Sequence, residues 1–194
     1  MKCYLLVGGQ SSRMGKPKAG LSISGLTFLE RTMTACHSVF DETVAVQRFR
    51  EPSVLGLRTI FEEEHEERAP IFGVIRALED SQSRAWVLAI DYPLMTSKTL
   101  EYLADSFRQS EAECWVPVWD GSPQMLCAGY SQELLPRLRK AVAEQELSIR
   151  KALSGAAVFT AAEDVLRTHV GGEPLFNVND AADYERASAI GGKR

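Results

Sequence analysis

Leu5-Leu-Val-Gly-Gly-Gln-Ser-Ser-Arg-Met-Gly-Lys-Pro-Lys18 sets the architecture of this chain, because an apolar run ends here in two glycines and then in polar and cationic residues. Residues 4–7 are short, apolar and bounded by glycine, which predicts a strand buried on both faces of a parallel sheet. Gly8 and Gly9 then allow a positive φ or a close approach of the backbone to a ligand. We therefore expect a buried strand followed by a loop with exposed backbone amides.

The loop after this strand offers the groups that bind a polyphosphate. Arg13 supplies a bidentate guanidinium, and Lys16 and Lys18 supply ammonium groups beside the backbone amides. Two common phosphate-binding patterns are excluded. G-x-x-x-x-G-K-[ST] would need glycine at Gln10 and serine or threonine at Pro17, and G-x-G-x-x-G fails because no glycine stands two residues after either member of the glycine pair. An ordinary glycine turn with solvated cations is the alternative.

Length and composition predict one globular domain covering residues 1–194. The chain has 194 residues, of which 45% are hydrophobic, and this is enough to bury a substantial single core. The formal net charge is -4, so no overall positive field attracts nucleic acid or an anionic membrane. The cations of the first loop are a local exception, and they favour a small anionic ligand as partner.

Cysteine usage and hydropathy predict a cytoplasmic protein. The four cysteines form no C-x-x-C pair and no zinc-binding spacing, so we expect them to be reduced thiols. The apolar run before Gly8 is too short for the apolar region of a signal peptide, and no other run approaches the length that spans a bilayer.

Strands and helices alternate along the sequence, and this predicts an α/β fold with a doubly wound, mainly parallel sheet. A turn at residues 120–123 joins the fifth and sixth strands, and Ser97 is expected to cap the third helix. The expected strands are 4–7, 42–46, 57–61, 86–90, 113–118, 126–130 and 156–160. The expected helices are 27–38, 70–80, 97–109, 135–143, 148–153 and 181–189.

The strand at residues 86–90 ends in Asp91-Tyr-Pro-Leu. In open α/β sheets, ligands bind beyond the carboxyl ends of the strands, so a carboxylate at this position is well placed to hold a metal ion. A turn or helix-capping role is the alternative for Asp91, because aspartate is frequent in turns. The polyphosphate loop, which is expected at the same edge of the sheet, favours the metal-ligand interpretation.

The first loop matches the pattern L-x-G-G-x-S-x-R-M-G-x-x-K, and in this the chain resembles the molybdenum cofactor guanylyltransferases (the molybdopterin-guanine dinucleotide biosynthesis protein A family) within the larger nucleotidyltransferase family. The resemblance implies a Rossmann-like fold of the nucleotide-diphospho-sugar transferase type. It also implies a Mg²⁺-dependent transfer of GMP from GTP to molybdopterin with release of pyrophosphate. Acceptor molybdoenzymes and other proteins of cofactor biosynthesis are implied as further partners.

The resemblance assigns roles to individual residues. It implies that Arg13, Lys18 and Asp91 are catalytic, that Asp91 binds Mg²⁺, and that Asn177 and Asn179 bind the pterin. The implied nucleotide contacts are Leu6, Val7, Gly8, Gly9, Lys18, Gln47, Glu62 and Asp91.

The chain departs from the family pattern at several positions. Gln47 stands where the family often has Asn, and Glu62 where it usually has Asp, so solvated-loop roles are alternatives for both. Phe72 replaces a small residue and could reshape the pocket next to it. Asp180-Ala181 replaces Thr-Pro, and Met125 stands where Pro is usual.

The predicted reaction needs no general base, because a terminal phosphate is already ionised near neutral pH. None of the three histidines stands in a catalytic motif, in agreement with such a mechanism. Two alternatives stay open: a transferase of the same fold that uses CTP or a sugar phosphate, and a non-catalytic nucleotide-binding regulatory module.

Overall fold

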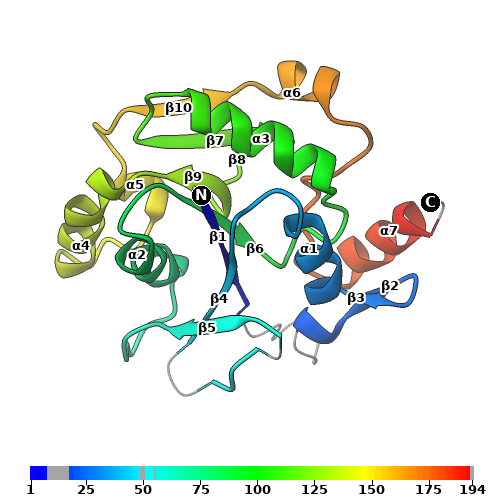
Figure 1. Cartoon of the computed structure of the whole chain (residues 1–194), viewed down its shortest axis with the longest axis horizontal. Coiled ribbons are helices and arrows are strands. Elements are labelled where there is room, and N and C mark those ends of the chain that lie inside the picture. Colours follow the sequence, from blue (N-terminus) through cyan, green and yellow to red (C-terminus); the bar gives the residue numbers. More distant parts are fainter. Residues whose placement is uncertain (8–17, 49–50, 55, 193–194) are drawn as a thin grey trace.

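The structure, a computed structural model, describes residues 1–7, 18–48, 51–54 and 56–192. Strand β1 (Lys2–Leu6) lies in the middle of the main sheet, between β4 (Thr43–Gln47) and β6 (Ala85–Ala89), and runs parallel to both. Strand β5 (Arg58–Phe61) extends this parallel half to one edge. The carboxyl ends of these strands therefore meet at the same edge of the sheet (Figure 1).

The other half of the sheet contains antiparallel pairs. The strand order is β10-β7-β9-β6-β1-β4-β5, and β9 (Cys127–Tyr130) is antiparallel to both of its neighbours. A tight turn at Asp120-Gly121, with φ of 48° and 68°, closes a hairpin between β7 (Cys114–Trp119) and β8 (Ser122–Pro123). Asp-Gly is a preferred pair for such a turn. Edge strand β10 (Val158–Ala161) is parallel to β7, so the expected mainly parallel, doubly wound sheet is confirmed.

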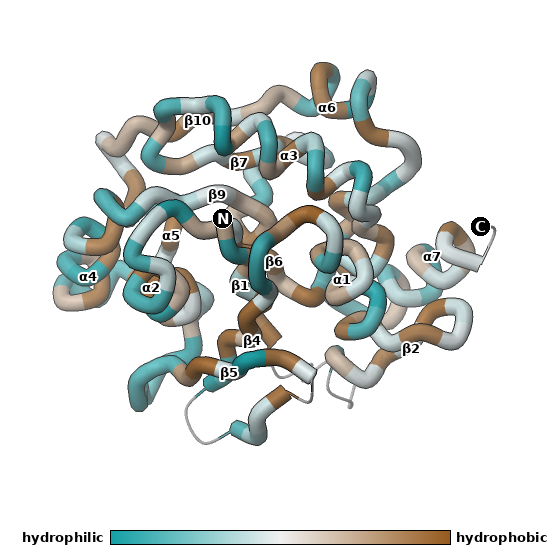
Figure 2. Tube along the Cα trace, in the orientation of Figure 1, coloured by the Kyte–Doolittle hydropathy of each residue, from teal (hydrophilic) through white to brown (hydrophobic). Residues whose placement is uncertain are grey.

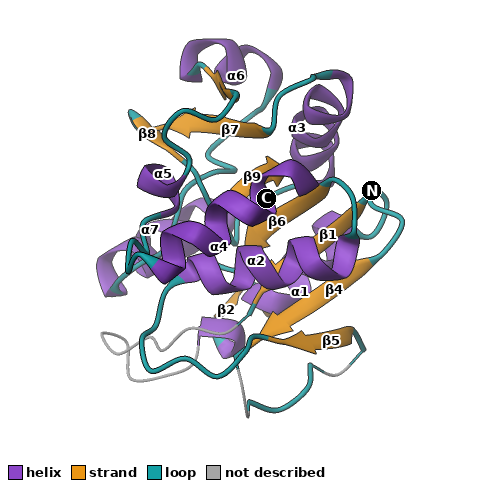
Figure 3. Cartoon of the chain, turned by 90° about the vertical axis from the view of Figure 1, so that its left-hand side faces the viewer, coloured by secondary structure: helices purple, strands orange, loops and turns teal. Residues whose placement is uncertain are grey.

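Helices cover both faces of the sheet (Figure 3). Side chains alternate along β1, so Cys3 and Leu5 pack on one face and Tyr4 on the other. The face of Cys3 and Leu5 packs against α1 (Phe28–Cys36), α3 (Ser97–Gln109) and α6 (Glu163–His169). The opposite face packs against α2 (Pro70–Ser81), α4 (Leu135–Ala143) and α5 (Ile149–Ala152). In Figure 2 strand β4 is mostly brown, whereas helices α2 and α4 carry both hydrophilic and hydrophobic residues along the tube.

A third, smaller apolar cluster ties the C-terminal segment to the edge of the sheet. It joins the hairpin of β2 (Ser22–Ile23) and β3 (Leu26–Thr27) to helix α7 (Ala181–Gly191), and the two lie side by side in Figure 1. Its buried members are Ile23, Phe28, Leu94, Phe176, Val178 and Ala187. This packing brings the segment before α7 next to the residues that follow β6.

One local expectation is wrong, and helix α6 and the two-residue strands β2, β3 and β8 were not predicted. Thr96 caps α3, because its side chain accepts a hydrogen bond from the backbone N–H of Thr99, so Ser97 is the first helical residue and not the cap. Helix α6 escaped prediction because its seven residues bury only Leu166 completely. His169 ends α6 and stacks on Tyr102, with 4.5 Å between the ring centroids.

The four cysteines are free and buried. Among the described residues, no helix has both the length and the apolar character that a bilayer crossing requires.

Candidate active site

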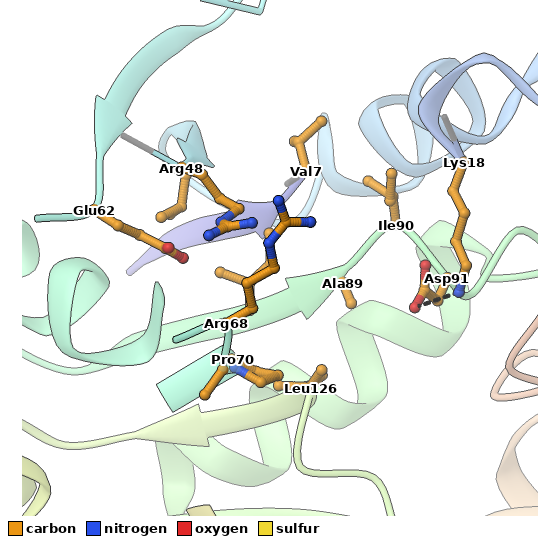
Figure 4. A pocket seen from close by; sticks show the side chains of 13 residues that line it. Val7, Lys18, Arg48, Glu62, Arg68, Pro70, Ala89, Ile90, Asp91 and Leu126 are labelled. Carbon is orange, nitrogen blue, oxygen red and sulfur yellow. Dashed lines mark ion pairs between the residues drawn. The ribbon is translucent and has the colours of Figure 1, made fainter. Parts of the chain in front are cut away.

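A cavity of about 410 Å³ opens at the carboxyl ends of β1, β4, β5 and β6 (Figure 4). Its walls are mostly apolar, with Leu6 and Val7 continuing from β1 and Ala69 and Pro70 at the start of α2. Its charged lining residues are Lys18, Arg48, Glu62, Arg68 and Asp91. Apolar walls with a few converging charged groups are typical of a small-molecule binding site.

Lys18 and Asp91 form an ion pair at one end of the cavity. The Lys18 ammonium lies 3.0 Å from Asp91 Oδ2 and donates a second hydrogen bond, of 2.8 Å, to the carbonyl oxygen of Val178. The two side chains are only 14% and 23% exposed. Burial raises the pKa of Asp91, and the ammonium of Lys18 opposes this shift. Three segments far apart in the sequence therefore meet at one charge pair.

The C-terminal segment is held against the residue that follows β6. The backbone N–H of Val178 donates to the carbonyl oxygen of Asp91 at 2.9 Å. Asn177 and Asn179 flank this contact: the buried Asn177 Oδ1 has no hydrogen-bond donor in the described part of the chain, whereas Asn179 is exposed. The two asparagines therefore lie beside the ion pair, although neither lines the cavity that the described residues form.

Glu62 occupies the other end of the cavity, where β5 ends (Figure 4). Burial raises the pKa of Glu62 to about 7, with the positive charge of Arg48 opposing this shift and Glu51 adding to it. The carboxylate packs against the first turns of α2, since a methyl group added at Gly73 would lie 3.0 Å from Glu62 Oε1 and 2.8 Å from Leu6. A larger residue at Gly73 would therefore push both Leu6 and Glu62 out of place.

Glu62→Gln is expected to stabilise the fold above pH 7 while leaving stability near pH 4 almost unchanged. The pKa of Glu62 is about 7 in the folded chain and ordinary, near 4.5, when unfolded. Ionisation therefore costs the folded state stability progressively between these two values, and the neutral amide avoids that cost. Partial solvent exposure moderates the effect. Melting temperatures of both proteins from pH 4 to 8 test this, and a difference that does not grow with pH would contradict it.

Five of the residues singled out in the sequence line this cavity: Leu6, Val7, Lys18, Glu62 and Asp91. Gly8, Gly9, Arg13 and Lys16 lie outside the described residues.

Gln47 and Phe72 point elsewhere. Val46 and Arg48 line the cavity, whereas Gln47 between them is buried and donates to the carbonyl oxygen of Pro52 at 3.3 Å, because successive side chains of a strand alternate in direction. Phe72 stacks on His65, with ring centroids 3.7 Å apart, and lines a separate hollow with it. The bulky ring does not enter the cavity.

Sequence reasoning missed Arg48 and Arg68. Arg48 directly follows β4, and Arg68 stands two residues before the N-terminal Pro70 of α2. Both positions belong to the edge of the sheet where ligands bind. The sequence could have indicated these two arginines, because one directly follows a strand and the other shortly precedes a helix. Other charged residues surround both, and this made them hard to distinguish.

The residues present suit a metal ion that is held by one protein carboxylate. Among the described residues, no group of three or more histidine, cysteine, aspartate or glutamate side chains could enclose a metal ion. Mg²⁺ commonly takes one or two carboxylates together with substrate phosphates and water. Asp91, partly exposed at the cavity rim, fits this mode.

Comparison with known proteins yields relatives that match this chain over almost its whole length. The chain is 29% identical to a "Probable molybdenum cofactor guanylyltransferase" of Aquifex aeolicus, over 97% of this chain and 90% of that protein. The crystal structure of molybdopterin-guanine dinucleotide biosynthesis protein A from Archaeoglobus fulgidus superposes with a TM-score of 0.84 at 26% identity, with both chains fully covered. A 2-C-methyl-D-erythritol 4-phosphate cytidylyltransferase from Thermus thermophilus, 18% identical with a TM-score of 0.70 over 97% of this chain and 98% of that one, shares the fold.

The family model for the MobA-like NTP transferase domain matches residues 3–164. This range contains every described residue that lines the cavity, Glu62 and Asp91 included. The chain therefore belongs to the MobA-like NTP transferase domain family and is a nucleotidyltransferase.

Proposed function

We propose that this nucleotidyltransferase transfers GMP from GTP to molybdopterin and releases pyrophosphate. The observation that carries the proposal is the pairing, in one cavity, of a carboxylate at one end with an ammonium–carboxylate pair at the other. Glu62 would bind the base, and Lys18 and Asp91 would bind the reacting phosphates. The names of the relatives from Aquifex aeolicus and Archaeoglobus fulgidus support the same reaction.

The chemistry of Glu62 favours guanine. Guanine carries two neighbouring donors, N1–H and the N2 amino group, and an ionised carboxylate can accept from both at once. Cytosine offers one donor and two acceptors on the corresponding edge, so an ionised carboxylate leaves it partly unpaired. The apolar walls beside Glu62, formed by Leu6, Ala69 and Pro70, suit the faces of a flat base.

The residues at the other end would position and neutralise phosphates. An oxygen of the acceptor phosphate attacks the α-phosphorus, the bond to the bridging oxygen breaks, and pyrophosphate leaves with the electron pair. Lys18 would donate to phosphate oxygens, and the backbone amides of Gly8 and Gly9 and the guanidinium of Arg13 would add further donors. Asp91 would hold Mg²⁺ together with substrate phosphates, and the ion would supply charge neutralisation when bound.

The acceptor would bind beside Asp91. The C-terminal segment packs there, and Asn177 Oδ1, which has no donor among the described residues, would accept from an N–H of the pterin. Asn179, exposed in the same segment, would contact the pterin from the rim. The proposal includes a cytoplasmic enzyme of one domain that passes its product to molybdoenzymes or other cofactor-biosynthesis proteins. Gln47 would support the nucleotide site indirectly, because it lies next to Arg48 at the end of β4 and its side chain donates to the carbonyl oxygen of Pro52.

A nucleotide panel tests the proposal. Thermal shifts with GTP, CTP, ATP and UTP in the presence of Mg²⁺ should be largest for GTP. Release of pyrophosphate should require both GTP and molybdopterin. A larger shift and faster release with CTP would replace the guanylyl proposal by the cytidylyl one, and binding without any release would favour a regulatory module.

The preference for GTP over ITP, which lacks the 2-amino group, is expected to grow as the pH rises from 6 to 8. The pKa of Glu62 is about 7, so its ionised fraction increases through this range, and only the ionised form accepts from both guanine donors. In Glu62→Gln the GTP to ITP affinity ratio should not vary with pH. A pH-independent ratio in the wild type would remove Glu62 from the base site.

The same titration bears on CTP. A protonated carboxyl group can donate to the ring N3 of cytosine and accept from its amino group. The affinity for CTP should therefore increase as the pH falls. The raised pKa of Glu62 is the specific observation that favours cytidylyl transfer as the second candidate function.

A further inference from the structure

Two guanidinium groups share the end of the cavity that holds Glu62. Arg48 extends from the end of β4 and Arg68 from the segment before α2, and Figure 4 shows both side chains directed into the same space. Within the described part of the chain, neither guanidinium forms a salt bridge with a carboxylate. Two guanidinium groups that converge in a cavity, and that have no salt-bridge partner among the described residues, offer their donors to a ligand with acceptor atoms.

The two arginines are not equivalent. The positive charge of Arg48 lowers the pKa of Glu62, whereas the other charge that acts on this carboxyl is that of Glu51. Arg48 therefore interacts electrostatically with the carboxylate of Glu62. Arg68 is exposed at the mouth of the cavity, so its donors are available to a bound molecule.

The guanine base has a second edge that matches this arrangement. Besides the two donors that face a carboxylate, guanine presents the acceptors O6 and N7 side by side, and the planar fork of arginine can donate to both. Adenine has a donor in place of O6, and cytosine has no equivalent of N7. A carboxylate together with one free guanidinium is thus complementary to guanine and to no other of the four common bases.

We propose that Arg68 is a specificity-determining residue that donates hydrogen bonds to O6 and N7 of the guanine base. This inference rests on the proposed use of GTP. Arg68 then contacts the edge of guanine that carries O6 and N7, and Glu62 contacts the edge that carries N1–H and the 2-amino group. A purine that lacks one of these two pairs of groups is bound less tightly.

The test compares GTP with 7-deaza-GTP, in which the N7 acceptor is replaced by a C–H group. Affinities of both nucleotides, with Mg²⁺ at pH 8, would be measured for the wild type, Arg68→Lys and Arg68→Ala. Arg150→Ala is the matched control, because Arg150 is exposed on α5, does not line the cavity and gives the same change in net charge. ITP would be measured in parallel to monitor the edge that Glu62 contacts.

We expect the wild type and Arg150→Ala to prefer GTP over 7-deaza-GTP by about tenfold, which is the scale of one lost base contact. Arg68→Lys should lose most of this preference, because an ammonium cannot meet two acceptors at once, and Arg68→Ala should lose all of it. The preference for GTP over ITP should persist in both variants, since it depends on Glu62.

Three outcomes would overturn the inference. A wild type that does not distinguish GTP from 7-deaza-GTP would show that N7 is not contacted. Equal weakening of both nucleotides by Arg68→Ala, with weaker binding of inorganic triphosphate, would assign Arg68 to phosphate. A wild type that binds no guanine nucleotide would overturn the proposed function as well, and the nucleotide panel separates that case from the other two.

Discussion

Asp91→Asn is expected to lower nucleotidyl transfer by at least about a hundredfold while the fold survives. The amide keeps the shape of the side chain but removes the charge that would hold a metal ion beside the phosphates, and loss of one electrostatic stabiliser costs rates of this order. The structure supports retention of the fold, because the contact that ties Asp91 to the C-terminal segment is made by its backbone carbonyl oxygen.

The measurement is Mg²⁺-dependent pyrophosphate release by the wild type and Asp91→Asn, with melting temperatures alongside. Asp105→Asn, on the exposed surface of α3, controls for the change in charge. An asparagine can replace aspartate in a turn or cap with little loss. A fully active Asp91→Asn protein would thus favour the capping alternative and remove the metal-ligand role.

Lys18→Met is expected to reduce transfer by about a hundredfold and to raise the apparent KM for the nucleotide. Methionine retains much of the apolar stem but not the ammonium, so the phosphates lose a donor and Asp91 is left in a half-buried position without its cation. The pKa of Asp91, already raised by burial, should rise further, because Lys18 is the group that opposes the shift.

Lys18 also has a structural role that its position in a phosphate-binding loop does not reveal. Its bond to the carbonyl oxygen of Val178 joins the segment after β1 to the C-terminal segment. We therefore expect the melting temperature of Lys18→Met to fall by a few degrees, in contrast to Lys140→Met on the exposed surface of α4. Unchanged kinetics in a Lys18→Met protein that remains folded would argue against a phosphate contact.

The sequence was most informative where one local pattern determines a structure. The apolar runs before Gly8 and before Asp91 predicted two buried strands, because short continuous apolar runs are typical of parallel sheets, and the structure pairs these two strands directly. Boundaries differ by one or two residues at most elements, since helix and strand ends depend on side chains that cap them. Thr96 instead of Ser97 at the start of α3 is such a case.

Tertiary packing decided the composition of the cavity. Val46, Gln47 and Arg48 are adjacent in sequence, yet the direction of β4 places Arg48 in the cavity and Gln47 in the core. Phe72 similarly stacks on His65 and lines a different hollow. The direction in which a side chain points depends on how its element packs, and a motif carries no information on this.

The sequence alone determined the family, the alternation of the longer strands and helices, and the positions of Lys18 and Asp91 after two strands of the sheet, because each follows from a contiguous pattern. Only the tertiary structure decided that Lys18, Asp91 and Val178 meet, that Glu62 is buried enough to titrate near neutrality, and that Arg48 and Arg68 converge beside it. The physical reason is that charge pairing and desolvation depend on distances between segments that are remote in the chain, and those distances exist only after the core has packed.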